Sequence, residues 1–330
     1  MVDDCHSRRR SGRISTTDTR DTKGTTKTSG KRPEVRLFLS VVAFVAIALL
    51  PARANAQIYE TFGIRAQGMG GAFVALADDA TASWWNPAGL ASGALLNSSI
   101  ESIHGDPSEM RARAIAIAIP SFGLSYYRLP LSGIRPTGST VSSPPGRQDL
   151  GDLSQFGVTV GQSIGDHFVL ATTLKILNGQ GDTLGDLDIG ATLRAGHARL
   201  GVNVKNVTKP TFGSGDDAVD LTRQVRVGAA FTSDSKGPSQ ASLTVDADLT
   251  TSGTVAGDER HLAAGAEVWH TNRRIGIRGG MAFNTVGDVR YSASAGVSLG
   301  FRKGAFFEAQ TTGGNDYARR GWAFGLRVTR

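Results

Sequence analysis

The chain has 330 residues, with 42 glycines, 7% aromatic residues and a formal net charge of +7. Frequent glycine with few aromatic residues indicates a β-rich fold with many turns. The charge is concentrated in residues 1–56, which hold 11 Lys and Arg against 5 Asp and Glu, so the remainder is nearly neutral. A neutral body gives no reason to expect nucleic acid as a partner.

Residues 1–56 are predicted to be a leader that ends in a cleaved signal peptide. The apolar run 37–50 follows Lys31, Arg32 and Arg36, and an A-x-A pattern places the cleavage between Ala56 and Gln57. The run is shorter than the ~20 residues that a spanning helix needs, which favours a signal over an anchor. A translation start near Val35 is an alternative to the long polar leader. Because the one cysteine, Cys5, lies in this leader, no disulfide or cysteine metal site is expected beyond it.

Residues 57–92 are predicted to be a compact hatch, too small to form a domain. Their glycines suit tight turns and close backbone approach, and 72–77 could make one or two apolar turns of helix. Asp78 and Asp79 are expected to cap a helix or turn, and Asn86-Pro87 to end the preceding element. The candidate hatch residues are Gly63, Arg65, Gly68, Met69, Gly70, Gly71, Asp78, Asp79, Asn86, Pro87, Ala88 and Gly89.

Residues 93–330 alternate between apolar and polar side chains. In 289–301, for example, every apolar residue has an odd number and every polar residue or glycine an even one. Such a period of two predicts strands with one apolar and one polar face. Fourteen segments are predicted to be strands, an even number as bacterial outer-membrane barrels require: 94–104, 110–119, 123–129, 154–164, 167–177, 185–195, 198–207, 222–232, 239–250, 259–270, 273–284, 289–301, 304–312 and 319–329.

The connections and the polar face favour a membrane barrel over a soluble one. Every second connection between the predicted strands tends to be tight, as at 165–166 and 196–197, which is typical of periplasmic turns. Several of the connections between them, namely 130–153, 208–221 and 251–258, are longer, which is typical of outer loops. A secreted sandwich or solenoid also alternates, but its polar face would meet water. Here the polar face carries mainly Gly, Ser, Thr and isolated charges, which suit a crowded lumen. We therefore predict an all-β, 14-stranded antiparallel transmembrane β-barrel of the Gram-negative outer membrane, in contact with its lipid.

Residues 63–90 resemble the N-terminal region of PorV/PorQ-type outer-membrane proteins. The likeness rests on Gly63–Ala66, Gly68–Phe73, Ala77–Asp79 and Trp85–Leu90. These proteins belong to the broader FadL-like barrels, whose members have 14 strands and an N-terminal hatch in the lumen. The resemblance implies a non-enzymatic component of type IX-like secretion or surface attachment, with secretion-machinery proteins or secreted cargo as partners. The alternative that it implies is a FadL-like channel for hydrophobic small molecules.

Charges of both signs on the predicted lumen face distinguish these two functions. Opposite charges in a narrow lumen would pin a hatch and favour a closed, scaffold-like barrel, whereas Phe73, Trp84 and Trp85 could line an apolar pocket for a permease. A small polar pore is a third possibility if the hatch is loose. The predicted lumen charges are Asp188, Arg194, Arg226, Asp246, Asp248, Glu267, Arg274, Arg278, Arg290 and Arg327.

No motif predicts catalysis, a cofactor or a metal. The run 68–71 lacks the Lys-Ser/Thr of a phosphate loop, and His104, His167, His197, His261 and His270 are scattered without ligand spacing. A soluble periplasmic binding protein is the remaining alternative from another class. Trp269, Trp322, Tyr126, Tyr127 and Tyr291 are expected in interfacial aromatic belts. Within the hatch, Arg65 is expected to reach wall carboxylates such as Asp246 or Asp248.

Overall fold

The computed structural model describes residues 62–105, 111–130, 151–215, 218–234, 237–254, 257–271 and 273–330. The predicted leader and signal peptide, with the cleavage between Ala56 and Gln57, lie outside these residues, as do positions 57–61 of the predicted hatch. No helix in these described ranges is both long and apolar enough to cross a membrane.

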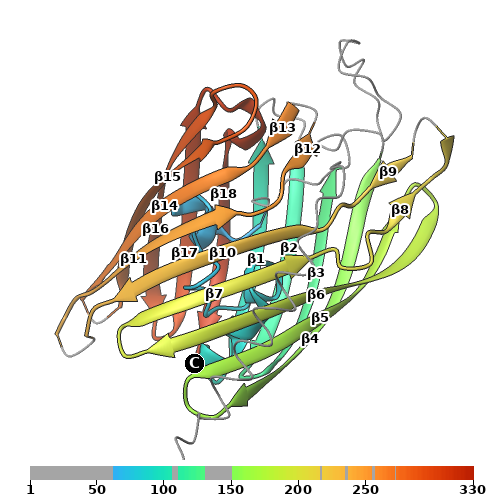
Figure 1. Ribbon diagram of the computed structural model, residues 1–330. Helices are drawn as coiled ribbons and strands as arrows, with labels where there is room; N and C mark the ends of the chain where they lie inside the picture. The colour runs from blue at the N-terminus through green and yellow to red at the C-terminus, as the bar shows by residue number, and fades with distance from the viewer. Residues whose placement is uncertain are drawn as a thin grey trace, which may run out of the picture. The chain divides into compact units, whose positions relative to one another are not determined.

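Fourteen strands form a closed antiparallel barrel, as the alternation predicts (Figure 1). Chain neighbours pair throughout the barrel, and the first strand closes it against the last, from Asn97 opposite Thr329 to Gly105 opposite Gly321. The strands are β1 (Asn97–Gly105), β2 (Arg111–Ile119), β3 (Phe122–Pro130), β4 (Asp152–Ile164), β5 (Phe168–Gly179), β6 (Asp182–Ala195), β7 (Ala198–Lys205), β10 (Gln224–Thr232), β11 (Gln240–Asp248), β14 (His261–His270), β15 (Ile275–Asn284), β16 (Tyr291–Arg302), β17 (Ala305–Gly314) and β18 (Gly321–Thr329).

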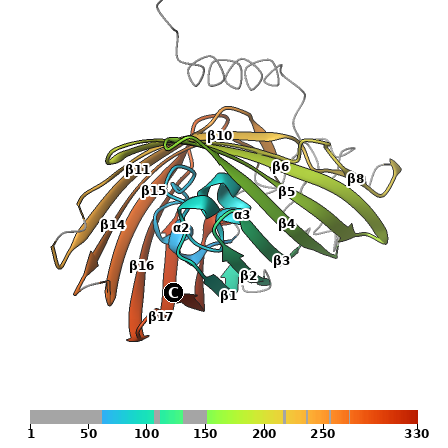
Figure 2. The same cartoon turned by 90° about the horizontal axis from the view of Figure 1, so that it is seen from below.

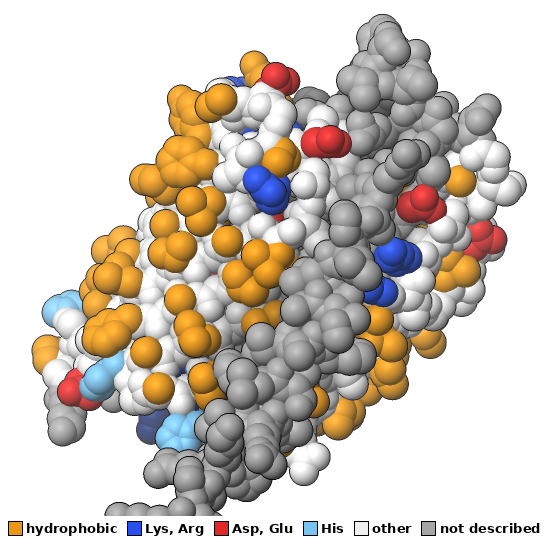
Figure 3. All heavy atoms as spheres, viewed as in Figure 1, with side chains coloured by type: hydrophobic (Ala, Val, Ile, Leu, Met, Phe, Trp, Pro, Cys, Tyr) orange, Lys and Arg blue, Asp and Glu red, His pale blue; other side chains and the backbone are white. Residues whose placement is uncertain are grey.

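The apolar face of these strands points out of the barrel. On β15, Ile277 is 63% exposed and Met281 49%, whereas the intervening Arg278 is 3% exposed. Figure 3 shows hydrophobic side chains spread over the outer face of the strands in view. Because the large apolar residues face outward around a closed cylinder, a soluble sandwich sealed around them is excluded.

The connections differ between the two ends of the barrel. One end carries tight turns such as Gly165–His167 and Gly196-His197, and the other carries the longer connections. Within the described residues, two of these longer connections contain hairpins that the alternation does not predict, β8 (Thr211–Phe212) with β9 (Val219–Asp220), and β12 (Ser252–Thr254) with β13 (Gly257–Glu259). A 3-10 turn, η5 (Tyr317–Arg319), lies between β17 and β18 at the same end.

Residues 62–93, which we call the inner segment, lie within the ring of strands (Figure 2). They contain α2 (Ile64–Gly68), α3 (Ala82–Trp85) and the 3-10 helix η2 (Pro87–Ser92). Helix α2 packs on β15 to β18, and η2 packs on β2 to β6. Between the α-helices, 72–77 makes only one turn, in which the backbone N–H groups of Leu76 and Ala77 donate to Phe73 O.

Two cross-strand glycine pairs let the inner segment approach the wall closely. Gly265 of β14 lies opposite Gly280 of β15. A Cβ at Gly280 would lie 2.1 Å from the carbonyl carbon of Met69, and one at Gly265 would lie 2.4 Å from its oxygen. Gly201 of β7 and Gly228 of β10 form the second pair. A Cβ at Gly201 would lie 2.6 Å from Val74 O, and one at Gly228 would lie 2.2 Å from Asp246 Oδ1 and 3.2 Å from Ala75 N. The small residues of the lumen face are therefore the sites of backbone contact.

Substitution of Gly280 by valine is expected to destabilise the protein by about 1–3 kcal/mol, because the added side chain overlaps the backbone at Met69. Gly185→Val in β6 is the matched control, since a Cβ there meets nothing within 4 Å. The measurement is the temperature at which the folded, fast-migrating form disappears on a gel. Equal transition temperatures for the two variants would contradict the close seating.

Candidate functional site

The inner segment is held to the lumen wall by a buried charge cluster centred on Arg65. Its Nε and Nη2 atoms donate to Glu267 of β14, at 2.8 Å from Oε1 and 2.7 Å from Oε2. Its Nη1 atom donates to Asp78 and lies 3.4 Å from an oxygen of Asp79. One guanidinium thus joins a wall carboxylate to two carboxylates of its own segment.

The electrostatics of the inner segment follow from this geometry. Burial alone would lower the pKa of Arg65, but Asp78, Glu267 and Asp79 together raise that pKa well above its usual value. Burial also opposes ionisation of Asp78, yet Arg65 and then Arg199 bring the pKa of Asp78 below its ordinary value. At Asp79 burial prevails over the attraction of Arg65, so its pKa is raised. Asp78, which Arg65 bonds closely, is therefore held charged, whereas Asp79, which lies farther from Arg65, is less easily ionised.

Wall carboxylates also bind the backbone of the inner segment. Glu101 of β1 accepts hydrogen bonds from Gly63 N at 2.8 Å and Ile64 N at 3.2 Å, which satisfies two N–H groups at the start of α2. Asp246 of β11 accepts from Phe73 N at 2.7 Å and Val74 N at 2.8 Å. These hydrogen bonds attach the backbone of the inner segment to the wall at residues 63–64 and 73–74.

The Asn86-Pro87 step fixes the second half of the inner segment. Asn86 Oδ1 accepts from Ala88 N at 3.1 Å and so caps η2, where Pro87 occupies the first turn. Its amide nitrogen donates to Val74 O at 2.8 Å and to Ala191 O of β6 at 3.2 Å. One asparagine therefore ties two parts of the segment to each other and to the wall.

The predicted hatch residues all lie in the inner segment, and all but the half-buried Asp78 are buried. Asp79 Oδ1 accepts from Thr81 N at 2.9 Å and so stabilises the turn before α3, whereas Asp78 pairs with Arg65 instead of capping. The remaining members are Gly63, Gly68, Met69, Gly70, Gly71, Asn86, Pro87, Ala88 and Gly89.

The prediction that Arg65 reaches Asp246 or Asp248 on the wall is wrong, because it binds Glu267. Helix α2 lies on β15 to β18, so its arginine meets Glu267 on the adjacent β14. Asp246 is occupied by backbone N–H groups of the inner segment, and Asp248 pairs with Arg226.

Most of the predicted lumen charges do face inward. Arg194 is half-buried and donates to Ser92 Oγ, and Asp248 is half-buried beside Arg226. Arg274 is an error of the prediction: it precedes β15 in the turn and is exposed, although the alternation gives it the lumen side. The buried members are Asp188, Arg226, Asp246, Glu267, Arg278, Arg290 and Arg327.

Further buried charges were missed. Lys175 of β5 lies 2.6 Å from both Asp186 and Asp188 of β6, and Glu308 of β17 lies 3.1 Å from Arg327. Lys175 and Glu308 could have been predicted to face the lumen, because each lies in a predicted strand on the side opposite its apolar residues. Glu101 had no such signal, because 97–102 is largely polar on both faces.

An aromatic cluster lies beside the charges. The Phe62 ring centroid is 4.7 Å from those of Trp84 and Tyr127, and the Tyr127 hydroxyl is 2.8 Å from Ser83 Oγ. Lys205 Nζ lies 3.2 Å from the Trp84 ring centroid. Aliphatic side chains from β3, β4 and β5 extend this buried cluster, namely Leu129, Leu153 and Leu177.

Two of the aromatic residues expected at the membrane interface therefore face the lumen. Tyr127 is 0% exposed, since its neighbour Tyr126 already occupies the outward side of the same strand. Trp269 is 2% exposed and packs on Phe306, with Arg327 over its ring. Tyr126, Tyr291 and Trp322 are exposed on the outer face as expected.

Comparisons with known proteins find likeness in structure alone. No family model matches the sequence, and no curated protein matches it. The "CymD monoaromatic hydrocarbon channel" has a TM-score of 0.53 at 10% identity, covering 81% of this chain and 97% of its own. The Ralstonia pickettii toluene transporter TbuX has a TM-score of 0.52 at 14% identity, covering 82% of this chain and 100% of its own.

At these identities the likeness concerns the fold. The fold that this chain shows is a closed barrel of 14 antiparallel strands. The comparisons offer no support for the PorV/PorQ resemblance of residues 63–90, which stays a prediction from the motif.

Replacing Arg65 by alanine is expected to loosen the inner segment and raise single-channel conductance in planar bilayers. The change leaves Glu267 buried without its bidentate partner, at a cost of about 3–5 kcal/mol. Arg128→Ala is the control, since its ion pair with Asp152 at 2.7 Å is exposed and contributes about 0–1 kcal/mol. Equal conductance in wild type and Arg65→Ala would remove the proposed role.

Proposed function

We propose that this protein is a non-enzymatic outer-membrane channel for hydrophobic small molecules, with the inner segment as its hatch. The observation that carries the proposal is the buried apolar and aromatic cluster in the lumen, formed where the inner segment meets β3, β4 and β5. A small apolar solute is taken up where aromatic and aliphatic side chains line a protected space beside a few polar groups. CymD and TbuX, whose names describe a hydrocarbon channel and a toluene transporter, share the fold.

Passage through the lumen requires the hatch to move. Phe62, Trp84 and Trp85 are 0% exposed, so the cluster is filled by the protein's own side chains in this state. On this side the hatch packs on the wall mainly through apolar and aromatic side chains, with Lys205 over the Trp84 ring, whereas α2 is held by the carboxylates of Glu267 and Glu101. Movement of α3 and η2 away from β3 and β4, with α2 kept in place, would open the apolar surface at the least electrostatic cost.

The expected result is faster uptake of labelled toluene or a labelled long-chain fatty acid by Gram-negative cells that express the full chain than by cells with an empty vector. A tether between the hatch and the wall should remove the difference. Arg194 of β6 donates to Ser92 Oγ of η2, so cysteines at these two positions can be joined by a short dithiol-specific crosslinker.

The matched control is the same double-cysteine variant without crosslinker, which should take up the probe at the wild-type rate. Uptake equal to that of the empty vector, with the barrel present and heat-modifiable in the outer-membrane fraction, would contradict the channel. Uptake that continues after complete crosslinking would instead contradict movement of η2 against the wall.

The many bonds between hatch and wall favour a second candidate, a closed barrel that serves protein secretion or surface attachment. Arg65, Glu101 and Asp246 hold three separate points of the inner segment. In this case deletion of the gene in its native host should reduce the amount of secreted or surface-attached protein and leave solute uptake unchanged. The reverse pattern would contradict a secretion role.

A further inference from the structure

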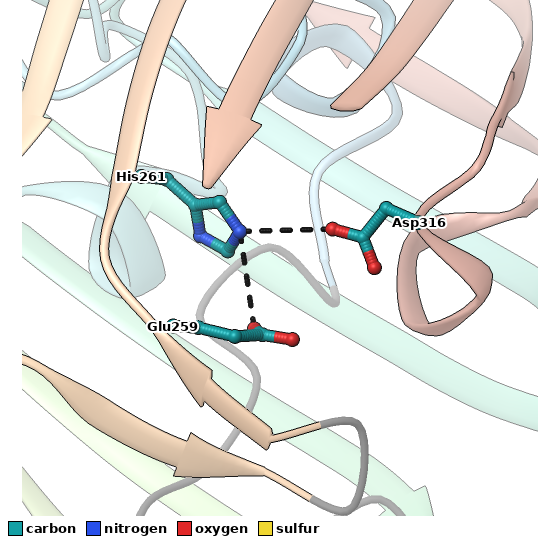
Figure 4. A group of neighbouring side chains, drawn as sticks. All are labelled: Glu259, His261 and Asp316. Carbon is teal, nitrogen blue, oxygen red and sulfur yellow. Dashed lines mark ion pairs between the residues drawn. The ribbon is translucent and has the colours of Figure 1, made fainter. Parts of the chain in front are cut away.

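We infer that Glu259, His261 and Asp316 form a binding site for one divalent transition-metal ion (Figure 4). The three side chains come from different parts of the chain: the last residue of β13, the first residue of β14 and the residue before η5. All three are buried, at 3%, 4% and 1% exposure. They lie at the barrel end with the longer connections, apart from the Arg65 cluster.

The ligand atoms of the three residues converge. His261 Nε2 lies 3.9 Å from Glu259 Oε2 and 3.7 Å from Asp316 Oδ2, and the three atoms are within 4.8 Å of one another. An ion bound tetrahedrally with bonds of about 2.1 Å separates its ligand atoms by roughly 3.4 Å. Small rotations of the two carboxylates would therefore bring the atoms to metal-binding distance, and a solvent molecule could complete the site.

Neighbouring groups hold the outer oxygen of Glu259, while the inner oxygen of each carboxylate faces the histidine. Arg290 Nη1 lies 3.0 Å from Glu259 Oε1 and 3.9 Å from Asp316 Oδ1. Thr254 Oγ1 donates to the same Glu259 Oε1 at 3.0 Å. Asp316 Oδ1, although buried, accepts no hydrogen bond from any described residue, so this carboxylate can turn toward an ion. Such outer contacts are the usual means by which proteins orient metal ligands.

The imidazole is oriented in the same way. Asp248 Oδ2 lies 3.6 Å from His261 Nδ1 on the other side of the ring, so a ring hydrogen on Nδ1 would leave the lone pair of Nε2 facing Glu259 and Asp316. A lone pair that faces two carboxylate oxygens is repelled unless a cation or a proton lies between them. One imidazole with two carboxylates suits Zn²⁺ and its neighbours in the first transition row better than Ca²⁺ or Mg²⁺, which prefer oxygen ligands alone.

A bound ion would join the connection at β12 and β13 to the connection at η5. The latter also contacts the hatch, since Arg319 Nη2 donates to Gly70 O at 2.9 Å. The metal would thus stabilise the connection that contains η5, and this connection contacts the inner segment through Arg319.

The test uses the tag-free full chain in detergent, stripped with EDTA and titrated with Zn²⁺ by calorimetry. We expect one ion per chain, and affinity at least about 100-fold weaker in His261→Ala, with weakening also in Glu259→Gln and Asp316→Asn. His270→Ala is the matched control, because His270 lies at the opposite end of the same strand and bonds Ser239 Oγ at 2.6 Å. Its affinity should equal that of the wild type.

Co²⁺ supplies an independent readout, because its visible absorption reports a nitrogen and oxygen ligand set in the wild type and should be lost in His261→Ala. Heat-modifiable migration establishes that each variant is folded, and Glu259→Gln, which keeps the size of the side chain, serves if His261→Ala fails to fold. Absence of Zn²⁺ binding by the folded wild type would mean that a proton occupies the cluster and would overturn the proposal. Equal affinity in folded Glu259→Gln, Asp316→Asn and wild type would overturn it as well.

Discussion

The bidentate pair between Arg65 and Glu267 is the interaction on which the interior depends. A charged guanidinium that is only 5% exposed is costly to bury without compensating charge, and Glu267 supplies that charge from the wall while Asp78 supplies it from the inner segment. The same logic extends along the wall, where Lys175 meets Asp186 and Asp188, and Arg327 meets Glu308. Charge matching across the lumen selects one position for the inner segment, whereas apolar packing alone would allow several.

Steric fit acts together with charge. The glycine pairs Gly265–Gly280 and Gly201–Gly228 remove side chains where the backbone of the inner segment reaches the wall. A barrel wall without such positions would keep the backbone of the segment at side-chain distance, and a Cβ at Gly228 would overlap the Asp246 carboxylate that binds Phe73 and Val74. The polar face of the strands thus positions the inner segment in two ways, through its charged side chains and through the glycines that allow the backbone to approach.

Most of the barrel could be predicted from the sequence because a period of two is a local property. Each strand carries its own alternation, so the fourteen strands and the outward direction of Ile277 or Leu326 follow without knowledge of the neighbours. Local rules failed where position along the strand mattered. Arg274 has the lumen parity but lies in a turn, and Tyr127 and Trp269 look like interface aromatics until the inner segment or Phe306 covers them. The partner of Arg65, 202 residues away, depends on how α2 docks, which no spacing encodes.

Closure of the barrel by β1 and β18 has a consequence for the order of events in folding. Leu96, which follows the inner segment closely, exchanges two backbone hydrogen bonds with Arg330, 234 residues farther along the sequence. Contacts of such long sequence separation form slowly, because the entropy of a long loop is lost before they can contribute. The inner segment is therefore synthesised before every barrel strand, and the wall around its buried arginine and tryptophans is complete only when β18 pairs with β1.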